Sequence, residues 1–142
     1  MQVNDFDAIV VVGGQSPMFT FKEAVDLQAF FIDFFKSGKV SAALCHGTSL
    51  LLYLKNPEGT PFVQGRSMTG FANSEEDYAD QAVGQKLMPF RIEDEAKKLG
   101  ARFSTKPAFQ PYAVRDENLI TGQQQHSGSE VARLLIEALE ES

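Results

Sequence analysis

The chain of 142 residues has only one cysteine, no tryptophan, and no apolar run of the length that crosses a membrane. A single cysteine cannot form an internal disulfide, which is typical of proteins in reducing compartments. A helix that spans a bilayer needs about 20 consecutive apolar residues. The first apolar stretch is also not preceded by basic residues, as it would be in a signal peptide. These absences predict a cytoplasmic protein that does not enter the membrane.

Positive charge is scarce as well. Lysine and arginine together number 13 against 19 aspartates and glutamates, so the net charge is −6. No cluster of basic residues is present to neutralise a phosphate backbone, so nucleic acid is not expected as a partner. The two histidines and the cysteine have no spacing typical of a metal site, and the G-x-G-x-x-G of a dinucleotide loop is missing. We therefore expect neither a metal ion nor a cofactor.

What the chain does have is a pattern of alternating strands and helices. Apolar residues make up 43% of it, with no linker or repeat, so residues 1–142 are predicted to form one domain. The β-branched run at 7–14 predicts a strand buried on both faces, and 40–44 a second strand. Apolar residues at helical spacing predict helices over 21–39 and 47–55. Strand, helix, strand, helix in this order indicates an α/β fold.

The second half of the chain continues with shorter elements. Prolines and glycines between 56 and 61 predict a turn before an extended segment. The expected elements after this turn are an extended segment at 62–68, helices at 73–85 and 91–100, two short strands within 112–124 and a closing helix at 127–142.

Cys45 stands at the junction between the second strand and its helix, in "AALCHGTSLL". Open α/β sheets bind ligands at this edge, and the first amides and the dipole of a helix favour negative charge there. Both effects favour the thiolate, which is the reactive form of cysteine. Ala43 and Gly47 are small, as a nucleophile elbow requires. The alternative is that Cys45 is an unreactive small apolar residue of the core.

A second glycine-rich turn should lie beside this junction. Gly13 and Gly14 end the first strand, and parallel strands bring their following loops to the same edge. The backbone amides of Gly14 and His46 are then expected to converge as an oxyanion hole.

Four motifs, "DAIVVVGG", "AALCHG", "GRSMTGF" and "LITGQQQHSG", together resemble the ThiJ/PfpI superfamily. This superfamily includes the parkinsonism-associated deglycase and the class I glutamine amidotransferase-like proteins, and its chaperone and glyoxalase III branch is the most similar. The resemblance implies a flavodoxin-like three-layer α/β sandwich with a mostly parallel sheet. It also implies a cofactor-independent cysteine nucleophile and a homodimer or higher homo-oligomer.

The resemblance implies roles for particular residues. Cys45 would be the nucleophile, His46 its base, and Glu76 the acid that orients the histidine. Glu75 and Asp77 are neighbours that could replace Glu76. Gly13, Glu75 and His126 are candidates for lining the site.

Each of these residues also has a structural interpretation. His46 could simply cap the helix, and a loop histidine such as His126 is commonly structural. Glu76 could close a capping box with Asn73 as the cap. Capping and orienting a histidine do not exclude one another.

The resemblance further implies a β-α-β portion ahead of the first strand, with a glutamate that hydrogen-bonds the nucleophile. No residue before Asp7 can replace that glutamate, so the sheet is expected to lack its first family strands.

Two classes of function follow from this interpretation. The first is an enzyme that acts on small reactive carbonyls such as methylglyoxal, or a related hydratase or amidase. The second is a non-catalytic stress chaperone or oxidation sensor that uses the same thiol. A glutamine amidotransferase is disfavoured, because the H-x-E motif near the C-terminal end of such domains is absent.

Overall fold

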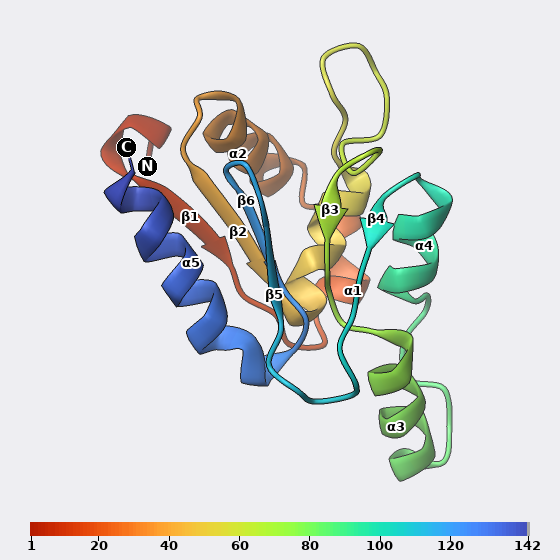
Figure 1. Ribbon diagram of the computed structural model, residues 1–142. Coiled ribbons are helices and arrows are strands. Elements are labelled where there is room, and N and C mark those ends of the chain that lie inside the picture. Colours follow the sequence, from red (N-terminus) through yellow and green to blue (C-terminus); the bar gives the residue numbers. More distant parts are fainter. Residues whose placement is uncertain (142) are drawn as a thin grey trace.

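A four-stranded sheet forms the centre of the computed structural model, which describes residues 1–141 (Figure 1). The strand order is β1-β2-β6-β5. β1 pairs parallel with β2 and β2 parallel with β6, whereas β5 is antiparallel to β6. The strands are β1 (Ala8–Val11), β2 (Val40–Leu44), β5 (Ala113–Asp116) and β6 (Leu119–Gly122). This mostly parallel sheet confirms the predicted α/β fold class.

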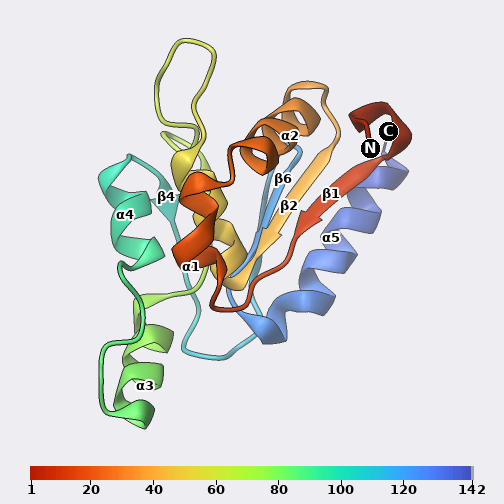
Figure 2. The same cartoon turned by 180° about the vertical axis from the view of Figure 1, so that it is seen from behind.

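Helices cover both faces of this sheet and make three layers, as Figures 1 and 2 show from opposite sides. α2 (Val25–Lys36) packs on one face, where its Phe31 contacts Ala43 of β2. α5 (Gly128–Glu140) packs on the other face, against Val40 and Ala42. Alternate residues of β2 thus point to opposite layers, as the period of a strand requires.

The remaining elements are short. β3 (Ser67–Met68) and β4 (Arg102–Phe103) form a small parallel sheet of their own. α4 (Ile92–Lys98) packs against β4, and α3 (Asn73–Val83) packs against α4. Gly84 ends α3 in the left-handed conformation at φ +84°. The other short helices are η1 (Val3–Asp5), α1 (Pro17–Thr20), η2 (Phe21–Glu23), η3 (Cys45–Tyr53) and η4 (Gln125–Ser127).

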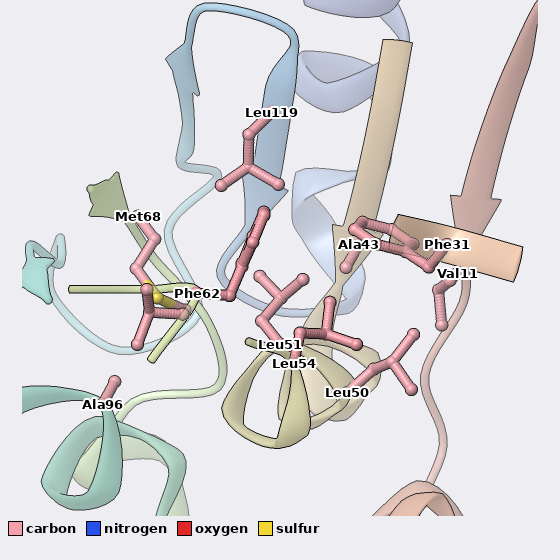
Figure 3. Packing of buried hydrophobic residues seen from close by; sticks show 11 residues of the cluster. Val11, Phe31, Ala43, Leu50, Leu51, Leu54, Phe62, Met68, Ala96 and Leu119 are labelled. Carbon is pink, nitrogen blue, oxygen red and sulfur yellow. The ribbon is translucent and has the colours of Figure 1, made fainter. Parts of the chain in front are cut away.

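The larger apolar core lies between α2, η3 and the sheet, as Figure 3 shows. Burial of each large side chain here stabilises the fold by about 2 kcal/mol. Its residues come from both halves of the chain: Val11, Phe31, Ala43, Leu50, Leu51, Leu54, Phe62, Val63, Met68, Ala96 and Leu119. Met68 of β3 and Leu119 of β6 thus share one core, which joins the two sheets.

Three expectations about these elements need correction. The first strand is not buried on both faces: Val10 is 45% and Val12 65% exposed, because β1 is an edge strand and α5 packs over β2 and β6 instead. The helix expected over 47–55 is a 3-10 helix that begins at Cys45. The extended segment expected over 62–68 is regular only at Ser67–Met68.

Other elements agree with the sequence. The two strands expected within 112–124 form a hairpin, and the closing helix buries Val131 and packs its leucines on β2 and β6. The end of that predicted helix, Ser142, lies outside the described residues. Within residues 1–141, none of the helices is both long and apolar enough to cross a membrane.

Candidate active site

Cys45 lies on a sharp turn directly after β2. Its φ is +62°, in the left-handed region that residues with a side chain rarely adopt. Such strain is held in place by the surrounding structure and is common at functional sites. The side chain is half-buried. The backbone at Cys45 therefore has the geometry of a nucleophile elbow, as the sequence predicted.

Two glycines permit this turn by close backbone contact. A Cβ on Gly47 would lie 2.7 Å from the carbonyl oxygen of Val11 and 2.8 Å from that of Val12. A Cβ on Gly13 would lie 2.9 Å from Cβ of Cys45. The loop after β1 therefore lies in direct contact with the elbow. A side chain at either glycine would push the loop and the elbow apart.

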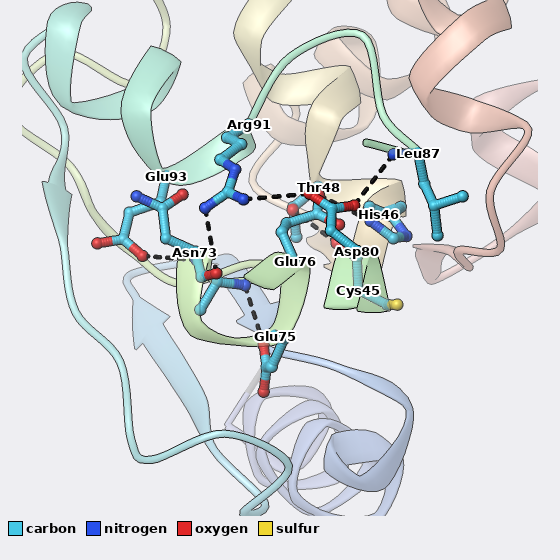
Figure 4. Close-up of polar contacts among 11 residues, drawn as sticks. Cys45, His46, Thr48, Asn73, Glu75, Glu76, Asp80, Leu87, Arg91 and Glu93 are labelled. Atoms are coloured by element: carbon cyan, nitrogen blue, oxygen red, sulfur yellow. Dashed lines mark hydrogen bonds and ion pairs between the residues drawn. The ribbon is translucent and has the colours of Figure 1, made fainter. Parts of the chain in front are cut away.

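His46 and Glu76 form a buried pair beside the cysteine, and Figure 4 shows them on the side of α3 that faces η3. Nε2 of His46 lies 3.2 Å from Oε2 of Glu76. His46 is 6% and Glu76 2% exposed, so water screens the pair little. The imidazole also stacks on Phe71, with 4.0 Å between ring centroids. The ring orientation is thus fixed by one acid and one aromatic face.

The histidine is protonated at neutral pH in this environment. Burial alone lowers the pKa of His46, but hydrogen bonds and charge interactions with Cys45 and Glu76 outweigh it and raise the pKa to about 9. An imidazolium next to a thiol and a carboxylate can both stabilise a thiolate and donate a proton.

The two consecutive glutamates of α3 have different partners, and this corrects the capping prediction. Ala72, not Asn73, is the N-cap, and Oε1 of Glu75 accepts the backbone N–H of Ala72 at 2.9 Å. Glu75, not Glu76, therefore closes the helix start. Glu75 also points away from His46 in Figure 4, so it does not substitute for Glu76. Asp77 instead binds Arg91 at 2.7 Å.

The other candidates lie at the same end of the sheet. Gly14 follows β1 with φ +100°, in the turn that precedes α1. His126 is exposed in η4, and its ring packs edge-to-face against Phe109 at 6.4 Å. The converging amides of Gly14 and His46, and a contact of His126 with substrate, remain predictions.

Three contributors to the site were not predicted from the sequence. Phe71, whose ring stacks on His46, is the last residue of the motif "GRSMTGF", but the motif alone gave it no role. Thr48 donates its hydroxyl to the carbonyl oxygen of Cys45 at 2.8 Å. Gln123 follows Gly122, which pairs with Leu44, so Gln123 and Cys45 leave the sheet at the same edge. A fully buried glutamine after a strand has no local sequence signal.

Three pockets of the described residues, of about 720, 560 and 440 Å³, lie away from the cysteine, and Cys45 lines none of the three. Cys45 packs instead against the cluster of Met18, Phe71, Met88 and Ile92. Within residues 1–141, no group of three or more histidine, cysteine, aspartate or glutamate side chains is arranged to hold a metal ion.

The fold and this elbow define an α/β protein with a cysteine and a neighbouring histidine–glutamate pair at the carboxyl edge of its sheet. The model of the DJ-1/PfpI family matches residues 1–138. The chain belongs to this family, which confirms the resemblance found in its motifs.

Similar proteins include several named glyoxalases. The glutathione-independent glyoxalase HSP31 of Saccharomyces cerevisiae is 29% identical over 98% of this chain and 60% of its own length. Glyoxalase 3 of Candida albicans is 29% identical over 96% of this chain and 59% of its own length. The chain thus spans about three fifths of the length of these relatives.

Solved structures agree in fold. Glyoxalase III from Candida albicans superposes with a TM-score of 0.82 at 28% identity, covering 97% of this chain and 59% of the other. The 24 kDa rapid encystment protein of Francisella tularensis reaches 0.89 at 27% identity, covering 98% of this chain and 60% of the other.

Proposed function

We propose that this chain is a cofactor-independent enzyme that converts a small 2-oxoaldehyde such as methylglyoxal into the 2-hydroxy acid. The observation that carries the proposal is the strained Cys45 at φ +62° beside the buried His46–Glu76 pair. The glyoxalase names of the relatives support the same chemistry. Cys45 is the nucleophile, His46 the proton carrier and Glu76 the acid that orients His46.

The first step is addition of the Cys45 thiolate to the aldehyde carbon. A carbon–sulfur bond forms, the carbonyl π electrons move to oxygen, and a hemithioacetal oxyanion results. Backbone amides of Gly14 and His46 stabilise this oxyanion. The His46 imidazolium then gives its proton to the oxyanion. The sulfur of Cys45 then carries no negative charge, so it no longer stabilises the imidazolium, and His46 loses its proton more easily.

The second step moves a hydrogen between the two adjacent carbons of the substrate. Neutral His46 removes the proton from the former aldehyde carbon, and an enediolate forms with its charge on the former ketone oxygen. Return of this proton to the neighbouring carbon, with transfer of the hydroxyl proton of the former aldehyde carbon to the former ketone oxygen, leaves a thioester of the 2-hydroxy acid on Cys45. Water then cleaves the thioester and releases the acid and the free thiol. The aldehyde is oxidised while the ketone is reduced, so the sum is substrate plus water and no outside electron acceptor is used.

Alkylation of Cys45 and methylglyoxal turnover, measured side by side across about pH 4 to 9, test this proposal. We expect turnover in the wild type, its complete loss in Cys45→Ser, and a loss of about 100-fold in kcat in Glu76→Gln. Asp77→Asn is the matched control, because it removes the next carboxylate along α3 without touching His46. Full turnover in Cys45→Ser would exclude the cysteine mechanism and its hydratase and amidase variants.

A second candidate function is a chaperone or oxidation sensor, and the exposed edge of β1 favours it. A groove of about 440 Å³ along this strand is lined entirely by apolar residues, among them Val10, Phe30 and Phe34. Exposed apolar surface of this kind binds unfolded chains or a second copy. Rapid alkylation of Cys45 without turnover would support this function. We also propose that the chain forms a homodimer or higher homo-oligomer and works in the reducing cytoplasm, as its single cysteine suits.

A further inference from the structure

Glu75 is a buried carboxylate that the proposed reaction does not use. Its side chain is completely buried. None of the ion pairs among residues 1–141 includes it. Besides the amide of Ala72, it accepts the backbone N–H of Phe109 and Nε2 of Gln123, both at 2.9 Å on Oε2. Burying a charge is costly unless it is fully hydrogen-bonded, so these three donors explain why the carboxylate is tolerated.

Gln123 connects this carboxylate to the site and to a long connecting segment. It directly follows Gly122, the last residue of β6, and Cys45 directly follows Leu44, the partner of Gly122 in β2, so both residues leave the sheet at the same edge. Its Oε1 accepts the backbone N–H of Lys106 at 2.9 Å, and its Nε2 also donates to the carbonyl of Lys106 at 3.0 Å. The segment 104–112 between β4 and β5 is thereby tied to the end of the sheet, along which it runs in Figures 1 and 2.

Phe109 is the strained residue of that segment. Its φ is +65°, a conformation that costs a residue with a side chain about 1 kcal/mol or more. Its amide donates a hydrogen bond to Glu75, which stabilises this conformation. Its ring packs edge-to-face against Tyr78, with 5.2 Å between ring centroids, and against His126 at 6.4 Å. Three aromatic rings therefore meet at the end of the sheet where β2 and β6 end.

We propose that Glu75 is a positioning residue that determines which carbonyl compounds reach Cys45. By fixing the amide of Phe109 and the amide group of Gln123, it places the aromatic wall of Phe109, Tyr78 and His126 at the edge of the sheet where the elbow lies. Glu76 acts on proton transfer through His46, whereas Glu75 acts on access and substrate binding. The substrate class named in this inference rests on the proposed function. The test by alkylation of Cys45 does not depend on that function.

Glu75→Gln is the direct test. An amide has one acceptor oxygen, so its NH₂ group would face either the N–H of Ala72 or both the N–H of Phe109 and the NH₂ of Gln123, and at least one hydrogen bond is lost. We expect faster hydrogen exchange of the Phe109 amide and a KM for methylglyoxal raised about tenfold with kcat nearly unchanged. The ratio of kcat/KM for phenylglyoxal to that for methylglyoxal should also change by about fivefold or more.

Phe109→Gly provides the same test without the risk of misfolding. Glycine adopts φ +65° freely, so the backbone is kept while the ring is removed. This variant should show the same change in KM and in selectivity as Glu75→Gln. Glu76→Gln is the contrasting control, since it should lower kcat instead.

Cys45 alkylation supplies a readout that is independent of turnover. The ratio of its rates with N-phenylmaleimide and with iodoacetamide should change in Glu75→Gln and in Phe109→Gly, even if the wild type turns over no substrate. A changed ratio without turnover would support the role of Glu75 and overturn the glyoxalase function. Unchanged KM and unchanged reagent ratios in both variants would overturn the role of Glu75, as would a loss confined to kcat.

Discussion

Removal of the charge on Glu76 should lower the pKa of His46. The pKa is about 9 in the wild type because interactions with Cys45 and Glu76 outweigh burial. In Glu76→Gln the side chain keeps its shape but loses its charge. Burial, which lowers the pKa of His46, is then opposed only by the interactions with Cys45, which raise it. We expect the pKa of His46 to fall by about two units, a 100-fold change in proton affinity.

The same shift makes the stability of the protein depend on pH. The folded-state pKa of His46 lies above its ordinary value of 6.5. The stabilisation is therefore complete below pH 6.5, declines as the pH rises, and is lost above about pH 9. A rise from 6.5 to about 9 corresponds to about 3 kcal/mol in the free energy of unfolding. At neutral pH, Glu76→Gln should have a lower free energy of unfolding than the wild type. Between neutral pH and pH 9, the free energy of unfolding of the variant should fall much less than that of the wild type.

Histidine NMR titration from about pH 5 to 10.5 measures the pKa directly. The chain has only two histidines, so His126→Gln assigns the signals without ambiguity. Urea unfolding at several pH values measures the stability. Asp77→Asn is the control for loss of a negative charge on α3. A wild-type His46 that titrates near 6.5, or an identical pKa in Glu76→Gln, would refute the reasoning.

Three further predictions concern the elbow and the sheet edge. Gly47→Ala should lower the free energy of unfolding by about 2 kcal/mol or more, because its Cβ meets the carbonyls of Val11 and Val12; thermal unfolding measures this. Cys45→Gly should be about 1 kcal/mol more stable than Cys45→Ala in urea, since glycine relieves the strain at φ +62°. Val12→Lys should change stability by less than about 0.5 kcal/mol, because the side chain is 65% exposed, and should dissociate an oligomer formed through β1 in gel filtration.

The elbow could be predicted from the sequence because its causes are local. A strand that ends in small residues, followed at once by a buried helix, leaves the junction residue few backbone conformations. Gly47 signals the close approach of another backbone, and the structure places the carbonyls of Val11 and Val12 there. The exposure of Val10 and Val12 was missed for the opposite reason. An apolar run predicts burial, but which strands α5 covers depends on packing between distant segments.

The roles of the two glutamates could not be assigned from the sequence. Asn73 is a favoured capping residue, so it was expected as the N-cap, one position after the actual N-cap Ala72. Ala72 carries no side-chain acceptor and gives no signal as an N-cap. Moving the start by one residue moves the capping role from Glu76 to Glu75. A prediction of helix boundaries is seldom accurate to one residue, whereas these roles depend on one residue.

The adjacency of the two glutamates is what lets one helix organise both sides of the site. Consecutive residues of a helix point about 100° apart, so their side chains leave the helix in different directions. Glu76 faces His46 on η3, while Glu75 faces Gln123 and Phe109. Because Glu75 also binds the amide of Ala72, the start of α3 fixes the direction of both carboxylates. A shift of α3 by one residue would move Glu75 toward the histidine and leave the amide of Phe109 without its acceptor, so proton transfer and substrate access would fail together.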